Sequence, residues 1–250
     1  MSTTEKPAIL LVPGAWHPPT AFAPLTKYLE SNGYPVVPLP LATVGAPDPL
    51  PNYDQDVSLI REAILKHGPS VVVLTHSYGG LPGASACKGL PDGAVSHFIF
   101  CCSFALPVGV SLMDALQNKP LPWFDVSDDG LTVNAMQNEE IFYNDIHDKE
   151  TLAELVGSLK PHSYKAFASK NTYAVYEDVK CTYVVCDEDK AIPVGAQWGM
   201  VEGARKAVAE KEGAKGGMEA VTLEGASHTP FVSRTEELGV IVRRCAGEAI

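Results

Sequence analysis

The chain has 250 residues, of which 46% are hydrophobic and 20% are charged, and its formal net charge at pH 7 is −11. This composition is typical of a globular protein and excludes a disordered or membrane-embedded chain. The acidic balance argues against nucleic acid or an anionic membrane surface as a partner, because both repel negative charge. The length allows one large domain or two small ones.

Short apolar runs alternate with helical patterns over the first hundred residues. Strands are expected at 8–12, 34–40, 70–75 and 95–102, and helices at 19–33, 52–68 and 78–90. The same alternation returns near the C-terminus, with strands at 181–186 and 218–225 and helices at 193–211 and 230–246. Continuous apolar runs separated by helices indicate a parallel sheet covered on both faces. We therefore expect an α/β fold with a mostly parallel sheet.

Residues 104–178 interrupt this alternation. They contain no obvious buried strand, but they carry short helical patterns, such as 148–160, and many aromatic residues. We expect a single domain whose core comprises 1–103 and 179–250 and whose helical cap is the insertion. A cap of this kind must face the carboxyl edge of the sheet, where ligands bind, so its aromatic residues indicate an apolar pocket.

Neither cysteine spacing nor the N-terminal segment indicates a special environment. No pair among the six cysteines has the spacing of zinc ligands, and the polar start, Met1–Pro7, is followed by an apolar run too short for a signal peptide. No apolar stretch approaches the length of a membrane span. We therefore expect a cytoplasmic protein with reduced, mostly buried thiols. The sequence also lacks a phosphate-binding loop, a dinucleotide fingerprint and a metal cluster, so we expect no cofactor and no metal.

Ser77 is the candidate nucleophile, because it stands directly between a predicted strand and a predicted helix. This is the setting of a nucleophile elbow, a tight turn that lifts one hydroxyl above the sheet. Gly79 and Gly80 keep the far side of the turn small, whereas Thr75 replaces the first glycine of the Gly-x-Ser-x-Gly pattern. The backbone N–H of Tyr78 lies at the helix N-terminus, where it can stabilise negative charge. A loop serine without a catalytic role is the alternative.

A nucleophilic serine needs a base, and the base needs a carboxylate to orient it. His228 lies in a loop of small residues between the last predicted strand and the last predicted helix. The other histidines lack this position, and His76 should point away from the serine that it precedes. Three acids, Asp187, Glu188 and Asp189, follow the preceding strand, and position alone does not choose among them.

Together these features resemble the α/β-hydrolase superfamily. More narrowly, the chain is similar to the small cofactor-free branch that contains salicylate methylesterase-like methyl-ester hydrolases and hydroxynitrile lyases. The resemblance is carried by LLVPGAWHPPTAF, THSYGG, FALPVGVSL, YVVCDEDKAIP and GASHTPF. It implies the α/β-hydrolase fold, and the branch pattern CTEDKGIP selects Asp189 as the acid, with Asp187 as the runner-up. It also implies that the Ala15 backbone N–H is the second oxyanion donor, although Pro13 replaces the usual histidine of that loop.

The resemblance implies a serine hydrolase that cleaves a small apolar carboxylic ester or lactone through an acyl-enzyme. A carbon–carbon lyase or a cyclase that uses the histidine as general base is the alternative, and a ligand receptor with this fold is a second one. Hydroxynitrile lyases of this branch carry a cap lysine, for which Lys160, Lys165 and Lys170 are candidates. The expected partner is a small-molecule substrate, and a homodimer is left open.

Four aromatic residues are candidates for the pocket wall. Trp16 and His17 follow the first predicted strand, and plain core packing is an equal alternative for Trp16. Trp123 and Phe124 stand among prolines that favour an extended loop rather than a helix core.

Overall fold

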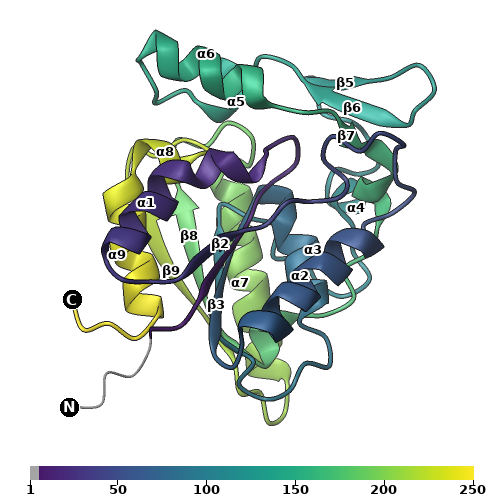
Figure 1. Cartoon of the computed structure of the whole chain (residues 1–250). Helices are drawn as coiled ribbons and strands as arrows, with labels where there is room; N and C mark the ends of the chain where they lie inside the picture. The colour runs from purple at the N-terminus through teal and green to yellow at the C-terminus, as the bar shows by residue number, and fades with distance from the viewer. Residues whose placement is uncertain (1–5) are drawn as a thin grey trace.

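The computed structural model describes residues 6–250 and is built around a six-stranded sheet (Figure 1). Every strand pairing in this sheet is parallel, and the strand order is β2-β1-β3-β4-β8-β9. The strands are β1 (Ile9–Val12), β2 (Val36–Pro38), β3 (Val71–His76), β4 (Val95–Cys101), β8 (Lys180–Cys186) and β9 (Gly217–Leu223). All six predicted strands are confirmed, and so is the α/β fold with a mostly parallel sheet.

Helices cover both faces of the sheet, as Figure 1 shows. One face carries α1 (Ala23–Ser31) and α9 (Thr235–Cys245), and the other carries α2 (Asp54–His67), α3 (Gly80–Ala86) and α7 (Val194–Glu210). Side chains alternate between these two layers along each strand, so that Leu11 packs in the α1/α9 layer and Val12 in the α2/α3/α7 layer. Because both layers are apolar, the strands read as continuous hydrophobic runs.

Three predicted helices are interrupted near their starts. Short separate turns precede the main helix at η1 (Pro19–Phe22), η2 (Ser77–Gly79) and α8 (Pro230–Ser233). Pro24 stands in the first turn of α1, where a missing N–H removes no helix hydrogen bond. The helix predicted over 78–90 ends at Ala86, and Gly89 beyond it has a φ of 64°, which glycine adopts readily.

The insertion between β4 and β8 contains helices, as expected, and also a small sheet of short strands that the sequence did not predict. Its elements are α4 (Leu112–Ala115), β5 (Phe124–Val126), β6 (Thr132–Ala135), α5 (Asn138–Phe142), α6 (Lys149–Ser158), β7 (His162–Ser163), η3 (Tyr164–Ala168) and η4 (Val175–Glu177). The strands form an antiparallel sheet in the order β5-β6-β7. They are two to four residues long, which is too short for a periodic sequence pattern. Much of the cap lies above the main body in Figure 1.

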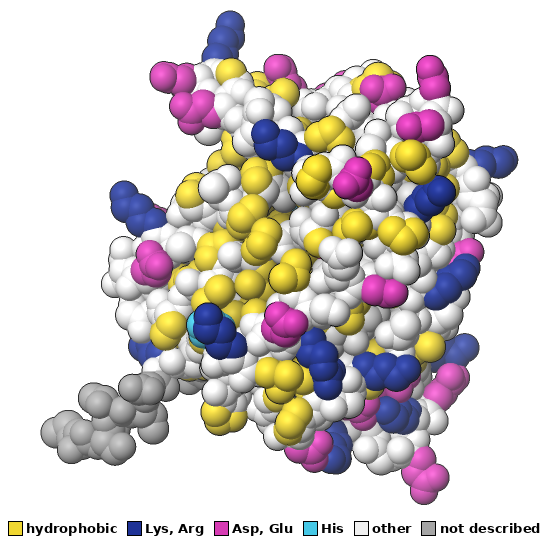
Figure 2. Space-filling view, turned by 45° about the vertical axis from the view of Figure 1, so that its right-hand side comes forward, with side chains coloured by type: hydrophobic (Ala, Val, Ile, Leu, Met, Phe, Trp, Pro, Cys, Tyr) yellow, Lys and Arg dark blue, Asp and Glu magenta, His cyan; other side chains and the backbone are white. Residues whose placement is uncertain are grey.

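Several expectations concern the whole chain rather than one element. Within residues 6–250, no helix is both long and apolar enough to cross a bilayer. The six cysteines are free thiols, and five of them are buried. Over the described residues visible in Figure 2, Lys and Arg side chains are dispersed among Asp and Glu and form no basic stripe. The expectation about the N-terminal segment falls mostly on residues 1–5, which lie outside the described residues.

Candidate functional site

Ser77 stands at the carboxyl end of β3 in a left-handed backbone conformation, with a φ of 52°. A non-glycine residue is strained there, as expected of a serine on a nucleophile elbow. The turn packs tightly against the loop that follows β1. A Cβ on Gly14 would lie 2.8 Å from the Ser77 Cβ, and a Cβ on Gly79 would lie 2.4 Å from the Pro13 carbonyl oxygen. Only glycine fits at these two positions, which bring the two loops together.

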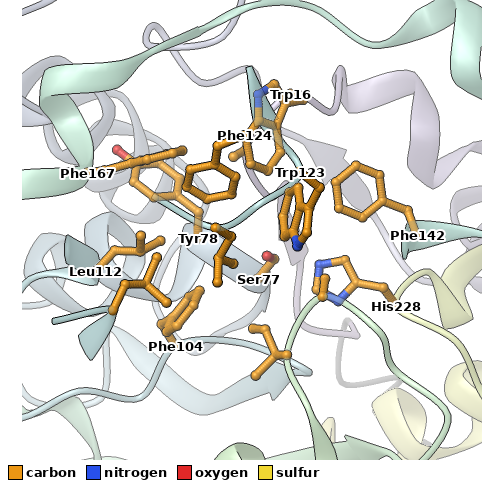
Figure 3. Close-up of a pocket in the computed structure, with 15 residues that line it drawn as sticks. Trp16, Ser77, Tyr78, Phe104, Leu112, Trp123, Phe124, Phe142, Phe167 and His228 are labelled. Atoms are coloured by element: carbon orange, nitrogen blue, oxygen red, sulfur yellow. The ribbon is translucent and has the colours of Figure 1, made fainter. Parts of the chain in front are cut away.

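The His228 imidazole is held by Asp189. His228 Nδ1 lies 2.8 Å from Asp189 Oδ2, and both side chains are buried. The other oxygen of Asp189 accepts the backbone N–H groups of Ala191 and Ile192, at 2.7 and 2.9 Å. These bonds fix the carboxylate, which accepts a hydrogen bond from the Nδ1–H group of His228 and leaves Nε2 free. Figure 3 shows the Ser77 hydroxyl and the His228 ring in the same pocket, which both residues line.

Among the three acids after β8, the structure brings only Asp189 to the imidazole. Asp187 Oδ1 accepts the N–H of Gly225 at 2.7 Å and so braces the loop that carries His228. Glu188 is exposed and lies 3.8 Å from the Lys190 ammonium. Asp187, the runner-up acid, thus lies near the site but forms no hydrogen bond with the candidate base His228.

Two residues that line the same cavity as Ser77 have backbone N–H groups without a protein acceptor in the described part of the chain. These residues are Ala15 and Tyr78. Tyr78 is the second residue of the turn η2 that leads into α3, where helix geometry leaves N–H groups unpaired. Free amides beside a hydroxyl are suited to stabilising an oxyanion.

An apolar pocket covers Ser77 (Figure 3), and its walls come from the sheet edge and from the cap. The lining residues are Ala15, Trp16, Ser77, Tyr78, Phe104, Leu112, Leu116, Leu121, Trp123, Phe124, Phe142, Phe167, Ala191, Ile192 and His228. Among these described residues none carries an acidic side chain, a lysine or an arginine. The rings fill most of the space, and the remaining cavity of about 20 Å³ has room for about one water molecule.

Three of the four predicted wall residues line the pocket, but His17 does not. The His17 ring lies behind the wall, with Nδ1 2.7 Å from the Ala15 carbonyl oxygen and Nε2 3.1 Å from the Tyr143 hydroxyl. Burial lowers its pKa to about 4, so the ring is neutral at pH 7. The sequence prediction missed Ala191 and Ile192, although both stand in the motif that follows Asp189.

His76 takes no part in the pocket wall. Its Nε2 lies 2.8 Å from the carbonyl oxygen of His228, so the ring supports the backbone beneath the candidate base. Burial, with a smaller contribution from the nearby His228, holds the His76 pKa well below its usual range. A neutral His76 adds no charge beside the base.

Comparison with known proteins identifies the family. The chain matches the alpha/beta hydrolase family over residues 9–238. It is a member of the alpha/beta hydrolase family. The resemblance drawn from the sequence motifs is thereby confirmed at the level of the family.

Named relatives of this hydrolase chain agree with that assignment. The probable hydrolase R7 of a Phoma species is 30% identical over 249 residues, which cover 97% of this chain and 99% of the relative. Polyneuridine aldehyde esterase has 22% identity and a TM-score of 0.75, covering 96% of this chain and 98% of its own. Tomato methylketone synthase I, solved with 2-tridecanone, has 19% identity and a TM-score of 0.77, covering 97% and 98%. The two solved structures show the shared fold, and the hydrolase family supports an enzymatic activity.

The candidate lysines of this alpha/beta hydrolase lie away from the pocket. Lys160, Lys165 and Lys170 are exposed, and none is among the described residues that line the cavity. Lys170 pairs with Asp114 at the surface. The described part of the chain therefore offers no ammonium group to a substrate at Ser77.

Proposed function

We propose that this alpha/beta hydrolase is a serine esterase that cleaves a small, uncharged, apolar carboxylic ester or lactone through an acyl-enzyme. The observation that carries the proposal is the 2.8 Å bond between His228 Nδ1 and Asp189 Oδ2, which leaves Nε2 free in a pocket that Ser77 also lines. A base held in this tautomer can take the serine proton.

The proposed reaction uses only this chain and water. Ser77 Oγ attacks the acyl carbon while His228 Nε2 takes its proton, and the N–H groups of Ala15 and Tyr78 stabilise the oxyanion. The imidazolium then gives the proton to the departing alkoxide, which leaves an ester on Ser77. A water molecule attacks that ester and loses its proton to His228; the imidazolium then returns the proton to Ser77 Oγ as the acid is released.

The side chains that line the pocket support an uncharged, apolar substrate. The pocket carries no charged partner among the described residues, so burying a charged substrate there would cost its hydration without compensation. Aromatic and leucine side chains instead favour a neutral apolar group. The missing ammonium also argues against cyanohydrin cleavage, in which the resembling lyases use a lysine.

The test combines active-site labelling with turnover. A fluorophosphonate should modify the wild-type chain once, at Ser77, and chromogenic esters with short apolar acyl groups should be hydrolysed. Ser77→Ala should lose the label and at least about 10⁴-fold in kcat, because residues of a triad act as a unit. Ser58→Ala, on the exposed surface of α2, is the matched control. An unmodified wild-type chain without turnover would instead favour a receptor, and full activity of Ser77→Ala would favour base chemistry without a nucleophile.

A further inference from the structure

The loop that carries the Ala15 amide is attached to the cap at successive residues. The Trp16 carbonyl oxygen accepts the N–H of Lys160 at 2.9 Å, and Trp16 Nε1 donates to the Val133 carbonyl oxygen at 2.8 Å. A third link runs from the Ala15 carbonyl through His17 to Tyr143. The loop is therefore part of the core segment of the chain, but these hydrogen bonds connect it to residues of the cap.

The direction of the third link follows from its chemistry. A carbonyl oxygen only accepts, so His17 Nδ1 carries the hydrogen that it shares with Ala15 at 2.7 Å. Nε2 then holds a lone pair and accepts the Tyr143 O–H at 3.1 Å. Burial lowers the pKa of His17 to about 4 and raises that of Tyr143. Both groups therefore keep these forms throughout the neutral range.

The backbone of this loop needs such support. Trp16 has a φ of 65°, a left-handed conformation that is strained for a tryptophan. The peptide plane after Ala15 bears the carbonyl that His17 binds, and the plane before it bears the N–H of Ala15, a residue that lines the pocket. Because only two soft dihedral angles separate these planes, fixing the carbonyl restricts the direction of the N–H.

We infer that Tyr143, acting through His17, is a positioning residue for the oxyanion donor of Ala15, so that the oxyanion hole is complete only when the cap is docked. This inference rests on the proposed esterase function. The walls leave room for about one water molecule, so a substrate has to displace parts of the cap before it binds.

The test is Tyr143→Phe, which removes the hydroxyl and keeps the ring. Loss of a whole oxyanion donor lowers kcat by about 10²–10³-fold. A displaced donor should lower kcat by about tenfold, with KM within about twofold of wild type, because the donor acts mainly in the transition state. Affinity for a trifluoromethyl ketone, whose carbonyl becomes an oxyanion when Ser77 Oγ adds and His228 takes the proton, should fall by about the same factor. Affinity for the alcohol product should not change.

Two further variants separate positioning from packing. Tyr173→Phe removes another hydroxyl from the insertion, one that donates to Asp178 and does not line the pocket over Ser77, and should leave kcat unchanged. His17→Asn keeps a donor for the Ala15 carbonyl but offers Tyr143 no ring nitrogen, so adding Tyr143→Phe to it should have no further effect. An unchanged kcat in Tyr143→Phe would overturn this inference and leave the proposed function standing. An equal loss of affinity for product and ketone, together with a lower Tm, would do the same. A wild-type chain without ester turnover or labelling overturns the proposed function and this inference with it.

Discussion

The side chain of Thr75 occupies the space that Gly83 leaves open in helix α3. A Cβ at position 83 would lie 2.6 Å from Thr75 Cγ2, closer than real Cβ atoms approach a neighbour. The Thr75 hydroxyl donates to the Ile99 carbonyl oxygen at 3.2 Å, so the methyl group is the part turned toward the helix. The elbow thus tolerates a residue larger than glycine before Ser77, because the helix that follows supplies the missing space.

This contact predicts a compensating pair of substitutions. Gly83→Ala should lower the free energy of unfolding by about 1–2 kcal/mol, because overpacking costs about 1–3 kcal/mol and the better helix propensity of alanine returns up to about 1 kcal/mol. Adding Thr75→Ser removes the methyl group and keeps the hydroxyl, so the double variant should regain most of the loss. Urea unfolding measures both values. A Gly83→Ala effect of the same size in the Thr75→Ser background would show that this contact is not its cause.

The two aspartates near the base should respond very differently to the same change. Asp189→Asn places an amide against His228 Nδ1 and favours the wrong tautomer, so kcat should fall by about 10³–10⁴-fold. Asp187→Asn keeps an oxygen for the Gly225 N–H and should stay within about threefold of wild type. Ester hydrolysis and fluorophosphonate labelling rates check both. Equal losses would move the orienting role to Asp187.

Replacing the aromatic side chains of the pocket wall by alanine should change the substrate preference while the chain still folds. Trp123 packs edge-on against Trp16 and Phe124, with ring centroids 5.6 and 4.6 Å apart, and faces the cavity over Ser77. Trp123→Ala and Phe124→Ala should raise kcat/KM for bulky acyl groups relative to acetate by about tenfold or more, since each accommodated methylene is worth about 1–3 kcal/mol. The measurement is a profile across esters of graded size, with thermal unfolding alongside. An unchanged profile together with the stability loss of a core cavity would mean that these rings only fill space.

Acid should destabilise the folded chain through its buried histidines. Burial lowers the pKa of His17 to about 4 and that of His162 to about 3, from an ordinary 6.5. Below pH 6.5 the unfolded chain therefore binds protons that the folded chain does not, so the free energy of unfolding falls as the pH falls toward these values. Each histidine contributes a slope of at most about 1.4 kcal/mol per pH unit.

His162→Phe isolates one of these contributions. Neither ring nitrogen of His162 has a hydrogen-bond partner within residues 6–250, and the ring stacks on Phe167 at 4.7 Å. The variant should retain stability at pH 7 and lose less of it between pH 6 and about 4, because a phenyl ring cannot titrate. Urea unfolding across this range checks the slope. A slope identical to that of wild type would show that His162 has an ordinary pKa in the folded chain.

The sequence alone determined the sheet and much of the candidate site. Strands such as 8–12 and 70–75 were predictable because burial on both faces leaves a continuous apolar run, which is a local signal. Ser77 was identifiable because it directly follows a strand, and His228 because it lies in the loop after another strand; parallel strands end at one edge of a sheet. The preference for Asp189 came from a family pattern, since position along the chain did not separate it from its neighbours.

The tertiary structure decided which side chains meet. The prediction that His17 lines the pocket was wrong because its direction depends on Tyr143, 126 residues away along the chain. The small cap sheet was missed because its two- to four-residue strands have no period of their own. Only the packed structure shows that Gly83 makes room for Thr75. Local patterns record burial and chain direction, whereas contacts between remote segments depend on how those segments pack, and that information is not in any short stretch of sequence.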